Sequence, residues 1–136
     1  MKNKVAMAAF TLAFMASVAA AACPLDLGRG IGWVVFSGDY MIAFRHDPTR
    51  IEVGQAFALL VNVCTRGDQP AELVAVAAQI TDRRYGMSAS PTIVVGKDGR
   101  HRVEGLVFDV AGQWEIAFDV RSGGAIEQLT HDVIVQ

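Results

Sequence analysis

The chain has 136 residues, 52% of them hydrophobic and 19% charged, and its formal net charge at pH 7 is −2. This length favours a single domain. A weakly acidic chain without a stripe of basic residues is a poor candidate for nucleic-acid binding, so we expect no nucleic-acid partner.

The N-terminal segment, residues 1–22, has the pattern of a secretory signal peptide. Lys2 and Lys4 open it, an apolar run follows, and Ala20-Ala21-Ala22 ends it in the small-residue pattern of a cleavage site. The apolar run is too short and too rich in alanine for a membrane span, although an uncleaved N-terminal anchor is the alternative interpretation. We therefore expect a mature domain at residues 23–136, without a transmembrane segment, in the periplasm or secreted.

Both cysteines belong to this mature domain, Cys23 at its start and Cys64 at the end of an apolar run. Because such pairs tend to close in an oxidising compartment, we predict a structural disulfide that ties the N-terminus to the domain. One alternative is a lipid on Cys23, which would anchor the protein, although Ala20 stands where a lipidation signal normally has Leu or Val. The other is a reactive or metal-binding pair, which the absence of a C-x-x-C motif disfavours.

From residue 40 onward, hydrophobic residues recur at every second position, the period of a strand with one buried face. Turn signals such as Asp47-Pro48 and Asp98-Gly99 separate the runs. The predicted strands follow in the order Tyr40–His46, Phe57–Val63, Val74–Ile80, Ile93–Val95, Arg102–Phe108, Trp114–Val120 and Leu129–Val135. This spacing predicts an all-β domain of about seven or eight strands, either a sandwich or a small barrel.

The sequence contains no recognisable catalytic constellation. None of its three histidines, His46, His101 and His131, lies in a Ser- or Cys-centred motif such as G-x-S-x-G. The acidic residues are spread over turns and over the polar faces of the predicted strands. We therefore expect the protein not to be an enzyme.

The polar loop at residues 81–90 is the candidate binding element, and it contains Arg83, Arg84, Tyr85 and Met87. Arg and Tyr are favoured at the centres of protein interfaces, so these residues suit a protein partner. Met87 has two interpretations, a plug folded over the open end of the core or a soft ligand for copper.

Histidines would have to complete a metal site around Met87, and His46 and His101 are the candidates, with His131 as a further one. Each histidine is also interpreted as an ordinary surface or edge residue.

An ordered series of short motifs resembles the YtkA-like family of small exported bacterial domains, over about residues 40 to 121. The motifs are Cys23, Tyr40–Phe44, Pro48–Phe57, Val61–Cys64, Gly86-Met87, Asp98–Phe108 and Gly112–Val120. The resemblance implies an immunoglobulin-like antiparallel β-sandwich. It also implies work near extracytoplasmic copper or haem proteins, as a binding or accessory module.

The sequence departs from this family at two segments that look like soft-metal sites in its relatives. Where relatives carry Met-Pro-x-His-x-His-Gly-Met, only Gly86 and Met87 match, and where they carry Phe-His-Met-Pro-Gly, only Phe108 and Gly112 match. Arginines occupy the first segment, and cationic side chains repel a metal ion.

Three functional hypotheses follow. The first is a non-enzymatic accessory module that acts through the loop at residues 81–90 on an envelope protein, with copper and haem proteins among the candidate partners, and without a cofactor of its own. The second is a periplasmic copper-handling protein with a weak Cu(I) site made by Met87 and a nearby histidine. The third is a purely structural component of the cell envelope.

Overall fold

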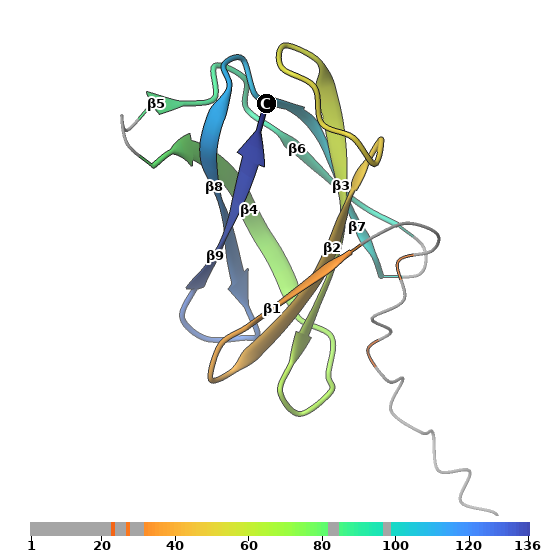
Figure 1. Cartoon of the computed structure of the whole chain (residues 1–136). Coiled ribbons are helices and arrows are strands. Elements are labelled where there is room, and N and C mark those ends of the chain that lie inside the picture. Colours follow the sequence, from red (N-terminus) through yellow and green to blue (C-terminus); the bar gives the residue numbers. More distant parts are fainter. Residues whose placement is uncertain (1–22, 24–26, 28–31, 82–84, 97–98) are drawn as a thin grey trace, which may run out of the picture.

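The computed structural model describes Cys23, Leu27 and residues 32–81, 85–96 and 99–136. Within these residues the chain forms nine strands in two antiparallel sheets and no helix, as Figure 1 shows. The first sheet has the order β1 (Trp33–Phe36), β2 (Tyr40–Asp47), β3 (Ala56–Thr65), β7 (His101–Val107) and β6 (Thr92–Val95). The second has the order β5 (Tyr85–Gly86), β4 (Glu72–Ile80), β8 (Gly112–Arg121) and β9 (Glu127–Val135).

The predicted all-β sandwich is confirmed, with two strands that the sequence pattern did not identify. β1 follows the N-terminal lead-in, and β5 lies inside the segment predicted to be an irregular loop at residues 81–90. β5 has only two residues, too few for hydrophobic alternation to be visible. Among the described residues, no helical segment has the length and hydrophobicity that a bilayer crossing requires. The predicted signal peptide lies outside the described residues.

The core lies between the two sheets and is built by the alternation along each strand. In β8, the side chains of Trp114, Ile116, Phe118 and Val120 are fully buried, whereas their neighbours in the strand are partly or fully exposed. Phe44 of β2 packs against Phe118 with ring centroids 5.0 Å apart, which joins the two sheets. Burying one such side chain contributes about 1.5–3 kcal/mol.

The predicted disulfide between Cys23 and Cys64 is present, with Cα atoms 5.8 Å apart. Cys64 lies near the end of β3, so the bridge holds Cys23 against the outer face of the first sheet. Leu27 is buried there, and its carbonyl oxygen accepts a hydrogen bond from Nε of Arg45 at 2.6 Å. A sulfur atom in a disulfide cannot also carry a thioether-linked lipid, so this bond and lipidation of Cys23 exclude each other.

One end of the sandwich gathers the loops that resemble the family motifs, and we call it the loop end. Strand β4 ends there at Ile80, which pairs with Trp114, and β8 begins there at Gly112, which pairs with Val135 near the C-terminus. The loop end comprises residues 48–55, 85–91 and 108–111. Figure 1 shows these segments beside the C-terminus, at the end opposite the β3–β4 connection.

Candidate functional site

A hydrogen bond between two loops organises the loop end. The hydroxyl of Tyr85 donates to Oδ2 of Asp109 at 2.9 Å, and the ring of Tyr85 meets Trp114 edge-on with centroids 6.4 Å apart. Trp114 donates its indole N–H to the carbonyl oxygen of Val110 at 3.0 Å, and Phe108 stacks on its ring at 4.6 Å. Tyr85 is therefore tied to the core while 45% of its surface remains exposed.

The Tyr85 phenol stays a hydrogen-bond donor over the whole physiological range. The hydrogen bond to Asp109, together with the negative charge of that carboxylate, raises the pKa of Tyr85 above its ordinary value. A neutral phenol and an ionised carboxylate form a charge-assisted hydrogen bond, which is stronger than one between neutral groups. The hydrogen bond to Asp109 thus helps to fix the position of the Tyr85 ring, in addition to the backbone pairing of the two-residue strand β5.

This contact joins the two segments in which the sequence departs from the YtkA-like pattern. Tyr85 lies in the first segment and Asp109 in the second, at the place where the pattern has histidine. Arg83 and Arg84, the other residues predicted to bind a partner in this loop, lie outside the described residues. Where the resemblance implies soft-metal ligands, the chain has an aromatic donor and a carboxylate that bind each other.

Met87 lies just beyond β5 and packs, half-buried, against the core cluster. Its backbone N–H donates to the carbonyl oxygen of Ala78 at 3.3 Å, which fixes the chain beside β4. Its side chain lines a groove of about 670 Å³ over the second sheet, with Gln79 and Glu115 among the other lining residues. No histidine lines this groove within the described part of the chain. The contacts match the plug interpretation.

Two histidines contact the same tryptophan ring at the open edge of the sandwich, where β1 of the first sheet approaches β9 of the second. The Trp33 ring lies 4.8 Å from the imidazole of His46 and 5.9 Å from that of His131, measured between centroids. All three side chains line a groove of about 520 Å³, together with Arg50 and Asp132. The sequence pointed to His46 and, less strongly, to His131, but not to Trp33.

His101 lies apart from this pair. It begins β7 and pairs with Val61 of β3, whereas His46 lies on β2 and pairs with Leu59 of the same strand. One strand therefore separates the two histidines, which puts their backbones about 10 Å apart sideways. The predicted combination of Met87, His46 and His101 in one site has no support in this geometry.

Two of the histidines are buried, so their interpretation as surface residues is wrong. His46 and His101 keep 9% and 5% of their surface exposed, because both face inward from the first sheet. Burial lowers the pKa of each below its ordinary value, more than neighbouring polar groups raise it. Burial also lowers the pKa of the partly exposed His131, against the charge of Asp132. The three imidazoles are therefore neutral near pH 7.

The capacity to hold a metal ion is limited in the described part of the chain. No cluster of three or more His, Cys, Asp or Glu side chains is placed to coordinate a metal there. His46 and His131 form at most a pair, and Nδ1 of His46 is buried without a hydrogen-bond partner. Two imidazoles suit a copper ion of low coordination number, but they do not make a closed site for zinc.

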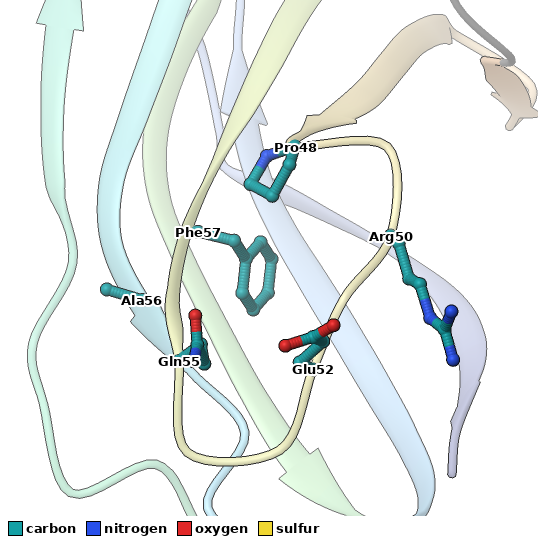
Figure 2. Close-up of a pocket in the computed structure, with 6 residues that line it drawn as sticks. All are labelled: Pro48, Arg50, Glu52, Gln55, Ala56 and Phe57. Atoms are coloured by element: carbon teal, nitrogen blue, oxygen red, sulfur yellow. The ribbon is translucent and has the colours of Figure 1, made fainter.

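A smaller hollow of about 280 Å³ lies under the loop at residues 48–55. Figure 2 shows the ring of Phe57 at its centre, the side chains of Glu52 and Gln55 near its rim, and Arg50 pointing away from them. Phe57 belongs to the core and packs against Phe108 with centroids 4.9 Å apart. The hollow thus places polar side chains over a buried core ring, and its polar groups, Arg50, Glu52 and Gln55, do not converge on one point in Figure 2.

The fold and its contacts define a small all-β sandwich with a disulfide, of a kind common in exported proteins. No protein-family model matches the sequence, and no curated protein has a significant match. Four chains among the solved structures match this chain, and two of these matches have TM-scores of 0.56 and 0.50. One is a DUF4426 family protein from Pseudomonas aeruginosa PAO1, with a TM-score of 0.56 and 10% identity over 76% of this chain and 94% of that one.

The other is a copper-bound variant of FetP from uropathogenic Escherichia coli strain F11. It has a TM-score of 0.50 and 9% identity over 76% of this chain and 94% of that chain. At such low identity the similarity shows a shared fold of small bacterial β domains. Membership of the YtkA-like family stays a prediction.

Proposed function

We propose that this chain is a non-enzymatic binding module of the bacterial cell envelope that holds a protein partner at its loop end. The observation that carries the proposal is the hydrogen bond from Tyr85 to Asp109, which presents an exposed aromatic ring on a braced support. An aromatic side chain that is already ordered loses little conformational entropy when a partner covers it.

The neighbouring sequence supports this role for Tyr85. Arg83 and Arg84 precede it, and Arg and Tyr are the residue types most often found at the energetic centres of protein interfaces. Loops held by a rigid sandwich are also the usual place for binding residues in such folds. The resemblance to the YtkA-like family, with its accessory proteins, belongs to the same proposal.

An envelope location is supported by two independent features. The first residues have the pattern of a signal peptide, and Cys23 is paired with Cys64 in a disulfide, a bond that persists mainly in oxidising compartments. The lack of enzymatic activity is proposed because a catalytic histidine needs a nucleophile within hydrogen-bond reach. The ring contacts of His46 and His131 are instead with the aromatic side chains of Trp33 and Phe44.

The experiment compares two exposed aromatic side chains at different places on the molecule. Tyr85→Ala removes the braced ring at the loop end, and Phe36→Ala removes a ring on β1 that is 58% exposed. Cells producing each variant are treated with a cleavable cross-linker, and the cross-linked species are identified by mass spectrometry. We expect Tyr85→Ala to abolish a cross-link that Phe36→Ala retains. Equal cross-linking of both variants would overturn the proposal.

Copper handling is the second candidate function, favoured by the convergence of His46 and His131 on Trp33. Imidazole nitrogens suit copper, and the face of an indole attracts a cation. The copper-bound FetP variant has a similar fold, which supports the same candidate. If copper binds here, His46 and His131 hold it, with Trp33 covering one side.

Titration of the purified protein with Cu(I) against a chelator tests this candidate. His131→Gln should abolish binding, whereas Met87→Ala should leave it unchanged, because Met87 lines a different groove. Loss of binding in Met87→Ala alone would favour the site predicted from the sequence instead. Affinity weaker than about micromolar in the unaltered protein would reject copper handling.

A further inference from the structure

The outer face of the second sheet contains a shallow trough that its strand register explains. Ala77 of β4 pairs with Ala117 of β8, which pairs with Thr130 of β9, so one row across the sheet has only small side chains. The rows on either side are longer, with Glu115 in one and Asp119 in the other. Because alternate residues of a strand share a face, all of these side chains point outward.

The trough opens toward the loop end. Ala77, Ala117 and Glu115 line the groove of about 670 Å³, together with Gln128, Met87 and residues 89–91. Thr130, Asp119 and Asp132 lie on the same face of the sheet beside this groove. Met87 and residues 89–91 continue directly from Tyr85 and Gly86 of β5, so the trough and the exposed Tyr85 ring border the same stretch of chain. Tyr85 pairs with the core-facing Ile80, so its ring lies on the opposite side of β5 from the trough. A partner that contacts both must pass over the edge of the sheet at β5.

Among the described residues, the carboxylates beside the trough have no cationic partner. Glu115 and Asp132 are direct cross-strand partners, an arrangement of like charges that destabilises a sheet. Asp132 accepts a hydrogen bond from Nε2 of Gln113 at 3.1 Å, and Asp119 accepts one from Nε2 of Gln128 at 2.9 Å. Neutral amides are thus their side-chain donors, and among the described residues none of these three carboxylates forms a salt bridge.

The one arginine on this face of β8 does not neutralise the negative charge of the carboxylates beside the trough. Arg121 is already paired with Glu72 of β4, Nε to Oε2 at 2.8 Å, at the end of the sheet away from Glu115. Three acidic groups therefore surround a floor of alanines, and a basic ligand has the complementary charge.

We propose that the trough receives an extended, basic segment of the protein partner. The inference rests on the proposed function and specifies the chemistry of the partner. The aliphatic stem of a Lys or Arg side chain lies on Ala77 and Ala117, as such stems cover apolar surfaces elsewhere. Its charged head lies between Glu115 and Asp132, where it relieves their mutual repulsion. Met87 adapts to the neighbouring apolar side chain, because a thioether chain is flexible.

The test uses a short peptide that alternates arginine with leucine, and a matched peptide with glutamate in place of arginine. Each is titrated into the isotopically labelled protein while the backbone amide resonances are followed by NMR. We expect the arginine peptide to shift the resonances of Ala77, Ala117 and Thr130, and the glutamate peptide to shift none of them. Glu115→Gln/Asp132→Asn should weaken the arginine peptide by about tenfold.

Asp39→Asn is the matched control, because it removes a carboxylate from the exposed turn between β1 and β2, and it should leave the affinity unchanged. The substitutions at Glu115 and Asp132 remove a repulsion, so the double variant should fold as well as the parent. Equal affinity of the double variant and the parent would overturn the proposal. So would shifts at these resonances caused by self-association of the chain without peptide.

Failure of this inference can be distinguished from failure of the proposed function. If Tyr85→Ala abolishes the cross-link in cells but Glu115→Gln/Asp132→Asn does not weaken it, the partner binds the loop end and avoids the trough, which overturns this inference alone. Loss of the same cross-link in the double variant, with its retention in Asp39→Asn, supports the inference.

Discussion

The two outer faces of the sandwich differ in how far they are covered by other parts of the chain. On the first sheet, Cys23 and Leu27 are buried against the outer face, where Ala43, Ala58 and Asn62 are also buried although they point away from the core. The face of the second sheet has no such cover among the described residues, and its floor at Ala77 is exposed. The Cys23–Cys64 disulfide and the buried Leu27 lie on the outer face of the first sheet, whereas the outer face of the second sheet has exposed and charged side chains. The groups that cover an outer face thus lie on the first sheet, and the surface proposed for recognition lies on the second.

The largest expected effect comes from removing the bond that seals the first sheet. Cys23→Ser/Cys64→Ser should lower the free energy of unfolding by about 4 kcal/mol, because the bridge closes a loop with a sequence separation of 41. Urea denaturation measures this change. Hydrogen exchange should also accelerate at Ala43 and Asn62 and stay unchanged at Ala77. Uniform acceleration over both sheets would mean that the faces are not independent.

A decrease in stability of intermediate size is expected when the pH is lowered. His46, His101 and His131 have pKa values in the folded state that are lowered by burial from 6.5. The unfolded chain therefore takes up protons first, so stability is complete above about pH 6.5 and decreases as the pH falls toward the folded-state pKa values. Two of these histidines face inward from the first sheet.

The variant His101→Gln measures how much one buried imidazole of the first sheet contributes to the pH dependence of stability. The free energy of unfolding of this variant should depend less on pH between about 7 and 5 than that of the parent protein. The control is Asp39→Asn, in the turn between β1 and β2, and its free energy of unfolding should depend on pH as that of the parent does. A parent protein whose stability rises on acidification through this range would contradict the direction of these pKa shifts.

The smallest effect is expected on the open face. Glu72→Gln breaks the ion pair with Arg121, which spans β4 and β8 on the outer side of the second sheet, and both side chains are exposed. Exposed ion pairs contribute little to stability, so the melting temperature should stay within experimental error of the parent. A large decrease would show that this face contributes to stability after all.

Much of the fold could be predicted because alternation is strong where a strand has one buried face. β8 shows this best, since Trp114, Ile116, Phe118 and Val120 are all fully buried as predicted. The pairing of Cys23 with Cys64 was predictable from the compartment and from there being only two cysteines. β1 and β5 escaped prediction because they have only four and two residues and their side chains are incompletely buried, which weakens the alternation.

The candidate sites were less predictable because each depends on strands that are distant in sequence. Tyr85 and Asp109 are 24 positions apart, and only the pairing of β4 with β8 brings their loops together. The departure of both segments from the family pattern was a usable signal, but it did not show that the two substituted residues bind each other. The trough required the register of three strands, in which Ala77, Ala117 and Thr130 happen to align.

The two tryptophans of the chain give the molecule a built-in optical reporter. Trp114 is fully buried with its indole N–H bonded, so its fluorescence should be blue-shifted and insensitive to solvent. Trp33 contacts two imidazoles at a partly exposed edge, and a protonated imidazole or a bound copper ion quenches a neighbouring indole. The red-shifted part of the emission therefore reports protonation or copper binding in the groove lined by Trp33, His46 and His131, without an added label.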